Sequence, residues 1–235
     1  TKSISNPKDI YIPRSIHHGT HDFIITGIAS KAFEYSKIES IHFPSDSELQ
    51  IIHEDAFRCS NINRIFIPSS VIEFEKGWCH YAYHLNNITI IQNKNRFISN
   101  YGENFIIGKS TPKSDTYEIL IFVRRDVEEV LIPPFIKKIS PYAFNYCNKL
   151  KTVIFSENSD ISIIDSEAFT DCSIEKIIIV PQIKQIGERA FYCCHKLLHV
   201  EIPPNSQLQK IENSVFVSTS IDKISIPCNV TEIGQ

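Results

Sequence analysis

The stretch from Lys184 to Pro203, KQIGERAFYCCHKLLHVEIP, holds the pattern that decides the fold. It also places Cys193 and Cys194 directly before His195, with His199 four residues further on. Sulfur and imidazole groups this close together could form a zinc site or a nucleophilic centre. The alternative is that they belong to one turn of a repeated structure, so we first searched the chain for copies of the stretch.

The Ala-Phe pair of this stretch recurs along the chain. Neighbouring copies are separated by 22 to 25 residues, with one exception, a long gap after residue 57. Trp78 lies in that gap, at the position where the next aromatic residue is expected. Aliphatic pairs three residues apart flank each copy, and most copies end in an apolar residue and proline. The copies are Ala-Phe at 32–33, 56–57, 143–144, 168–169 and 190–191, and Val-Phe at 215–216. Self-similarity at one period is typical of stacked repeats.

The end of each repeat predicts a short strand. In HVEIP, Val200 and Ile202 alternate with His199 and Glu201, which is the pattern of a half-buried strand, and proline ends the strand because it cannot donate to a ladder. Stacked repeats pair such strands and share one core. We expect the recurring aromatic side chains to stack in that core as a ladder formed by Phe33, Phe57, Trp78, Phe144, Phe169, Phe191 and Phe216.

Residues 92–129 interrupt the repeat. Two short apolar runs, 105–107 and 119–122, are separated by polar turn residues, which predicts an inserted β-hairpin or degenerate repeat. Apart from this insertion, we expect one solenoid over residues 1–235 with roughly eight or nine coils. The chain contains no methionine, which suggests a fragment of a longer protein, and whether an export signal or anchor lies outside it stays open.

Composition excludes several classes of protein. A hydrophobic content of 42% with 22% charged residues is typical of a globular chain, and the net charge of −3 argues against nucleic-acid binding. No apolar run is long enough for a membrane segment. The seven cysteines are spread along the chain, so we expect free thiols and no disulfide scaffold. No glycine-rich phosphate loop, zinc-protease or serine-hydrolase motif is present, so we predict no enzyme and no cofactor.

The cysteines follow the repeat. Cys147, Cys172 and Cys194 each lie three residues after the repeated Phe, and other repeats have Ser or Thr at the same offset. This predicts a column of small side chains just inside the bend of each coil. Zinc is disfavoured because vicinal cysteines have the wrong spacing, and strand alternation turns His199 away from Cys194. A vicinal disulfide between Cys193 and Cys194 stays open.

With these motifs, the chain resembles the BspA-like leucine-rich repeats, a family named after bacterial surface antigens. The resemblance rests on KQIGERAFYCCHKLLHVEIP, KKISPYAFNYCNKLKTVIF and QKIENSVFVSTSIDKISIP and covers residues 10–233. It implies a right-handed horseshoe solenoid of mixed α/β class, dominated by β-structure, with one strand per repeat on the concave face and shorter strands or short helical turns on the other. It also implies cell-surface adhesion without catalysis.

Outward strand positions are the candidate partner-binding residues. Phe66, Ile154 and Ile178 are apolar where solvent is expected, so they are either ordinary exposed residues, residues covered by the hairpin, or anchors for a partner. The full predicted set on the concave face is His42, Arg64, Phe66, Ile154, Lys176, Ile178, His199 and Glu201. Asn87 and Asn229 begin possible glycosylation motifs.

The predicted function is a non-catalytic module that binds a protein ligand, most simply an adhesin at the cell surface that docks extracellular-matrix or cell-surface proteins. The glycosylation motifs and the resemblance favour this location. The alternative is an intracellular scaffold or receptor-type interaction module in the cytoplasm, which the odd number of cysteines favours.

Overall fold

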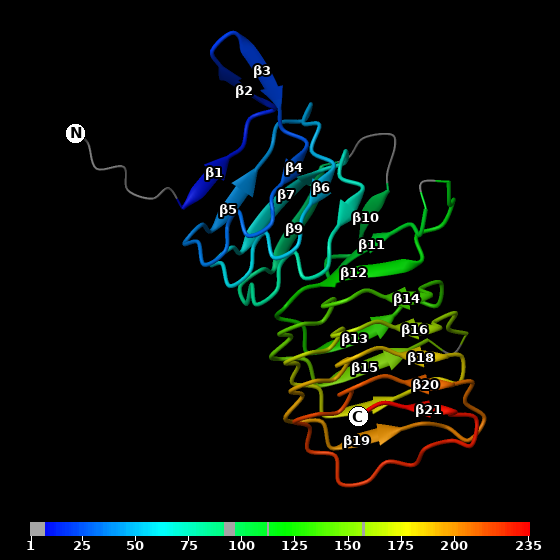
Figure 1. Cartoon of the computed structure of the whole chain (residues 1–235). Coiled ribbons are helices and arrows are strands. Elements are labelled where there is room, and N and C mark those ends of the chain that lie inside the picture. The colour runs from blue at the N-terminus through cyan, green and yellow to red at the C-terminus, as the bar shows by residue number, and fades with distance from the viewer. Residues whose placement is uncertain (1–7, 92–96, 112, 157) are drawn as a thin grey trace. The chain divides into compact units, whose positions relative to one another are not determined.

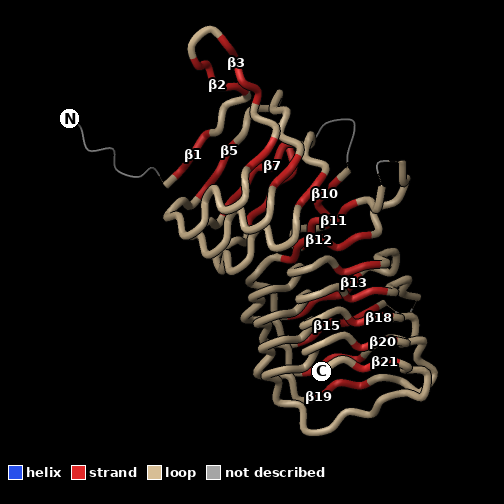
Figure 2. The backbone as a smooth tube through the Cα atoms, viewed as in Figure 1, coloured by secondary structure: helices blue, strands red, loops and turns tan. Residues whose placement is uncertain are grey.

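The computed structural model describes residues 8–91, 97–111, 113–156 and 158–235. These residues form short strands joined by turns, and within them no helix is present (Figure 2). The chain forms two compact units, Thr1–Asn100 and Tyr101–Gln235. Each unit is built from coils, and successive coils pair their strands in parallel (Figure 1).

The unit Thr1–Asn100 contains two parallel sheets. Their strands follow from the repeat, because the alternating segment that leads to the proline falls in the first sheet and the second residue of each aliphatic pair falls in the second. The first sheet has the order β1 (Asp9–Tyr11), β5 (Ser40–His42), β7 (Arg64–Pro68) and β9 (Asn87–Ile91). The second has the order β4 (Gly27–Ile28), β6 (Ile51–Ile52) and β8 (Glu73–Phe74). Strand β10 (Ile98–Tyr101) lies at the boundary of the two units.

Two local features of this unit were not expected from the sequence. An exposed antiparallel hairpin joins β2 (Ser15–His18) to β3 (His21–Ile24) and replaces a regular coil. The side chain of Asn100 caps the free edge of β9: its Oδ1 accepts from the Ile90 N–H at 2.9 Å, and its Nδ2 donates to the Ile88 carbonyl at 2.9 Å. The side-chain amide therefore takes the place that a further strand would fill.

The unit Tyr101–Gln235 repeats the two-sheet arrangement more regularly. One parallel sheet has the order β13 (Glu129–Ile132), β15 (Thr152–Phe155), β17 (Lys176–Ile178) and β19 (His199–Glu201). The other continues in parallel from β12 (Ile119–Val123) through β14 (Lys138–Ile139), β16 (Ile163–Ile164), β18 (Gln185–Ile186), β20 (Lys210–Ile211) and β21 (Glu232–Ile233). Gly187, directly after β18, has no room for a side chain, since a Cβ there would lie 2.5 Å from the Ser166 backbone nitrogen of the adjacent coil.

Inside the predicted insertion, β11 (Phe105–Gly108) pairs antiparallel with β12, and β12 then pairs in parallel with β14. The two apolar runs of the sequence are therefore a hairpin that is part of the sheet. Residues 92–96 and 112 of the predicted insertion lie outside the described residues. Near the C-terminus, residues 221–226 repeat the sequence pattern of the strands but do not form a strand.

The recurring aromatic rings stack between coils. In the second unit, ring centroids are separated by 4.4 Å between Phe144 and Phe169, 5.0 Å between Phe169 and Phe191, and 5.7 Å between Phe191 and Phe216, with interplanar angles of 11–15°. Phe144, Phe169 and Phe191 are fully buried. The ring stack therefore lies in the core that the coils share.

The first unit has a shorter ring stack. Phe33 and Phe57 stack at 5.3 Å and 6°, whereas Trp78 meets Phe57 edge-on at 6.2 Å and 87°. Phe57 is fully buried and Phe33 is half-buried. The indole at position 78 therefore ends the parallel stacking in this unit.

The expectation of short helical turns is wrong, and the backbone shows why. Residues two positions before and two positions after the repeated Phe have positive φ: Tyr142 (59°) and Tyr146 (60°) flank Phe144, and Arg189 (55°) and Cys193 (56°) flank Phe191. A right-handed helix cannot continue through left-handed residues at such short intervals. Backbone N–H groups that would bond within a helix donate to the adjacent coil instead, as in the 2.8 Å bond from the Phe144 N–H to the Ala168 carbonyl.

Candidate protein-binding surface

The outward face of the sheet formed by β13, β15, β17 and β19 carries three exposed aliphatic side chains. Leu131, Ile154 and Ile178 are 58%, 41% and 45% exposed. Alternation along each strand places Val130, Val153 and Ile177 in the core and turns the three aliphatic residues outward. We call Leu131, Ile154 and Ile178 the aliphatic row.

Strand register aligns the members of the aliphatic row. Leu131 lies directly opposite Ile154, and the pairing of Thr152 with Lys176 two residues earlier brings Ile154 beside Ile178. On the next strand Ile178 lies opposite Glu201, so the row ends at a carboxylate. A continuous row of exposed aliphatic side chains across neighbouring strands is a feature of interaction surfaces.

A cavity of about 360 Å³ lies between Ile154 and Ile178. Phe155 and Val180 contribute apolar walls, and Lys176 lies at its edge. The cavity is therefore apolar on most sides and open to solvent where Ile154 and Ile178 are exposed. It can accept one apolar side chain from outside.

The charges around the aliphatic row alternate in sign. The Lys176 Nζ lies 3.8 Å from a Glu201 carboxylate oxygen, and the Lys151 Nζ lies 3.7 Å from a Glu128 carboxylate oxygen. Both pairs are well exposed, so they contribute little to stability. Because opposite charges lie side by side, their fields largely cancel beyond a Debye length.

The predicted concave residues therefore fall into two sets. Ile154, Lys176, Ile178, His199 and Glu201 share one face of the β13–β15–β17–β19 sheet. The remaining predicted residues belong to the other unit, where they lie on the β5–β7 sheet: they are His42, Arg64 and Phe66. The sequence-based list missed Leu131, although the alternation in EVLIP already turns it outward.

The face of β5 and β7 has a different chemistry. The rings of His42 and Phe66 stack at 4.6 Å and 20°, and both residues are half-buried. The Ser40 hydroxyl donates to an Asp9 carboxylate oxygen and lies 3.1 Å from the His42 Nε2 atom. Arg64 is exposed beside them. Phe66 is thus packed against His42, and it is a poorer candidate anchor than the aliphatic row.

The adjacent residues Cys193 and Cys194 have opposite environments: Cys194 lies in the core, and Cys193 lines a surface pocket. Cys194 is fully buried, and its Sγ donates to the Phe169 carbonyl at 3.0 Å. Burial raises the pKa of the Cys194 thiol to about 12, and burial likewise raises the pKa of Cys172 well above its usual value. Both thiols are therefore protonated at neutral pH and poor nucleophiles.

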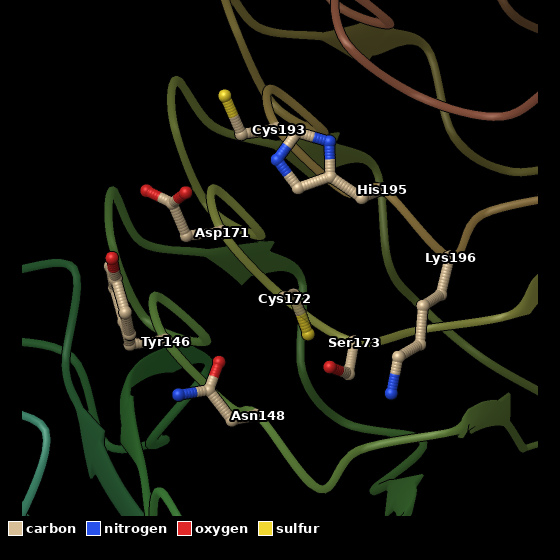
Figure 3. A pocket seen from close by; sticks show the side chains of 8 residues that line it. All are labelled: Tyr146, Asn148, Asp171, Cys172, Ser173, Cys193, His195 and Lys196. Carbon is tan, nitrogen blue, oxygen red and sulfur yellow. The ribbon is translucent and has the colours of Figure 1, made fainter.

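Cys193 lies half-buried at the rim of a polar pocket of about 300 Å³ (Figure 3). Asp171 and His195 line the same pocket, and the Cys172 side chain points away from the Cys193 sulfur (Figure 3). His199 lies apart from this pocket, on the outward face of β19. Within the described parts of the chain, no three His, Cys, Asp or Glu side chains form a group that could hold a metal ion. None of the seven cysteines, all of which lie within the described residues, forms a disulfide.

The two possible glycosylation sites are both exposed. Asn87 begins β9 and points outward together with Thr89. Asn229 lies in a turn, and its Nδ2 donates to the Ser206 carbonyl at 2.8 Å. Glycosylation of Asn87 and Asn229 stays a prediction.

Comparison with protein families assigns the chain to one family. The model of the BspA type leucine rich repeat region matches residues 8–104 and 120–235, with six copies of the repeat. The chain belongs to this family. Among the described residues of this BspA-type protein, no helix has the length and apolar character needed to cross a bilayer.

Solved structures show the same fold. A leucine rich cell surface protein from Faecalibacterium prausnitzii is similar with a TM-score of 0.61 and 21% identity, over 89% of this chain and 57% of that one. A leucine-rich repeat protein from Eubacterium ventriosum is similar with a TM-score of 0.52 and 16% identity, over 96% of this chain and 74% of that one. The chain thus spans little more than half the length of the first structure. A comparison with curated proteins gave no match.

Proposed function

We propose that this BspA-type chain is a non-catalytic protein-binding module and that it docks its partner on the outward face of β13, β15, β17 and β19. The aliphatic row supports this proposal most strongly: its three side chains are aligned and exposed, and two of them, Ile154 and Ile178, border an open apolar cavity of about 360 Å³. Such a patch, rimmed by polar residues, is typical of the centre of a protein interface. The repeat scaffold holds these side chains on strands, so little conformational entropy is lost on binding.

A role at the cell surface is part of the proposal. It is supported by the family of the chain and by the similarity to a structure described as a cell surface protein. An adhesin that binds matrix proteins or proteins of neighbouring cells fits a rigid face of this kind.

A second candidate is an intracellular scaffold with the same binding face. The state of the cysteines favours it, because none of the seven forms a disulfide, and Cys228 is exposed. Secreted proteins seldom keep so many free thiols in an oxidising environment. Labelling of intact cells with a reagent that does not cross membranes would separate the two locations, since only a surface protein would be labelled.

The binding proposal is tested with purified chain against an array of extracellular-matrix and cell-surface proteins. We expect at least one binder whose affinity falls at least tenfold when Ile154 and Ile178 are both replaced by Thr, because truncation of central apolar anchors removes most of the binding energy. The matched control is Leu198→Thr, which changes an equally exposed aliphatic residue outside the row. Binders that respond equally to both changes would contradict this placement of the interface.

A further inference from the structure

The spacing of the aliphatic row distinguishes between possible partners. Its three members lie on three consecutive strands, β13, β15 and β17. Neighbouring strands are about 4.8 Å apart, so the row from Leu131 to Ile178 is about 10 Å long and runs across the strands. A partner that fills the row must present three apolar side chains at about the same interval.

An α-helix meets this requirement better than an extended strand. Apolar residues at positions i, i+3 or i+4, and i+7 of a helix form one stripe, and seven residues at about 1.5 Å each span about 10.5 Å. In an extended strand, residues on one face are about 6.7 Å apart, so three of them span about 13 Å. The helical stripe therefore matches the row at each step, whereas the strand runs out of register at the third side chain.

Exposed carboxylates lie at both ends of the row. Glu201 lies opposite Ile178, with the Lys176 Nζ 3.8 Å from its carboxylate, and Glu129 shares the outward face of β13 with Leu131. The charges therefore do not set the direction of a docked helix.

We propose that the aliphatic row is a docking site for an amphipathic α-helix of a partner protein, which lies across β13, β15 and β17. The central side chains of the helical stripe contact Ile154 and Ile178, and one of them enters the cavity between these two residues. This inference rests on the proposed protein-binding function. It adds the secondary structure and the apolar spacing of the partner segment.

The proposal is tested by selecting binders to the purified chain from two displayed libraries. One library randomises the exposed face of a stable helix, and the other consists of extended peptides held between two strands. We expect binders mainly from the helical library, with apolar residues enriched at i, i+3 or i+4, and i+7. Their affinity should fall at least tenfold for Ile154→Thr and for Ile178→Thr and change less than twofold for Leu198→Thr.

Each remaining outcome also decides something. Binders only from the extended library, sensitive to Ile154→Thr, would overturn the helical partner and leave the proposed function intact. Binders that tolerate both Ile154→Thr and Ile178→Thr, or a lack of binders from either library, would overturn the docking site itself. Circular dichroism of each variant identifies any loss of folding before its affinity is interpreted.

Discussion

The aromatic ladders of the two units show how far the stacking of coils depends on one residue per repeat. In Tyr101–Gln235 every position of the ladder is Phe, and the rings stack within 15° of parallel. In Thr1–Asn100 the third position is Trp78, which stands at 87° to Phe57 and also packs against Phe74 at 4.9 Å. The indole of Trp78 therefore does not continue the parallel stack but meets Phe57 edge-on, which is also a favourable arrangement for an aromatic pair.

The outward faces of the sheets also differ between the two units. On the second unit, equivalent strand positions hold the exposed residues Leu131, Ile154 and Ile178, and an open apolar cavity lies beside Ile154 and Ile178. On the first unit, the ring of Phe66 stacks on His42, which covers one face of the ring. The repeat thus sets which positions point outward, and the individual side chains decide whether such a face can receive a partner.

The largest expected effect comes from the interior of the regular ladder. Phe169→Ala should lower the free energy of unfolding by about 3–5 kcal/mol, because it removes a fully buried ring with neighbours on both sides. Phe33→Ala should cost only about 1–2 kcal/mol, because Phe33 is half-buried and stacks on Phe57 alone among the described ladder rings. Urea unfolding of both variants measures the difference. Equal losses would contradict the two-sided stacking of Phe169.

The cysteine column should make the second unit sensitive to alkali. The thiol pKa of Cys194 rises from 9.0 to about 12 on folding, so its contribution to stability is present below pH 9 and is lost as the pH rises toward 12. The matching positions of the first unit hold Ser36 and Ser60, which do not titrate in this range. Stability should therefore fall between pH 9 and 11 in the native chain, and less steeply in Cys194→Ser. An identical pH profile for this variant would argue against thiol burial.

The smallest expected change is at the outward face. Ile178→Thr should alter the free energy of unfolding by about 1 kcal/mol or less, because the side chain is already 45% exposed and Thr suits a strand. The measurement is urea unfolding beside Phe169→Ala. A loss of several kcal/mol would place Ile178 in the core and remove it from the candidate interface.

Much of this architecture could be predicted because the repeat ties sequence offsets to positions in a coil. The aliphatic pairs, the ring ladder and the strand that ends at proline all follow from one period. The helical turns were predicted wrongly, because positive φ at residues such as Tyr146 and Cys193 is unusual for these side chains and leaves no signal in their identity.

Other features depend on single residues that break the repeat. Buried Arg125 places its guanidinium 4.5 Å above the ring of Phe122 and donates to the Ala143 carbonyl at 3.0 Å. The amide of Asn100 ends a sheet. Neither role can be predicted from periodicity, because each occurs once. In the candidate site, alternation alone placed Ile154 and Ile178 outward, but the cavity between them depends on how Phe155 and Val180 pack.

The most direct test of the coil geometry is the rate of alkylation of each cysteine in the native chain, measured by mass spectrometry after a short exposure to iodoacetamide. Cys193 and Cys194 are adjacent in sequence, yet one lies at a pocket rim and the other is fully buried. We predict that Cys193 and exposed Cys228 are modified, whereas Cys147, Cys172 and Cys194 stay protected until the chain is unfolded. Modification of Cys194 as fast as Cys193 would contradict the assignment of inside and outside positions on which this account depends.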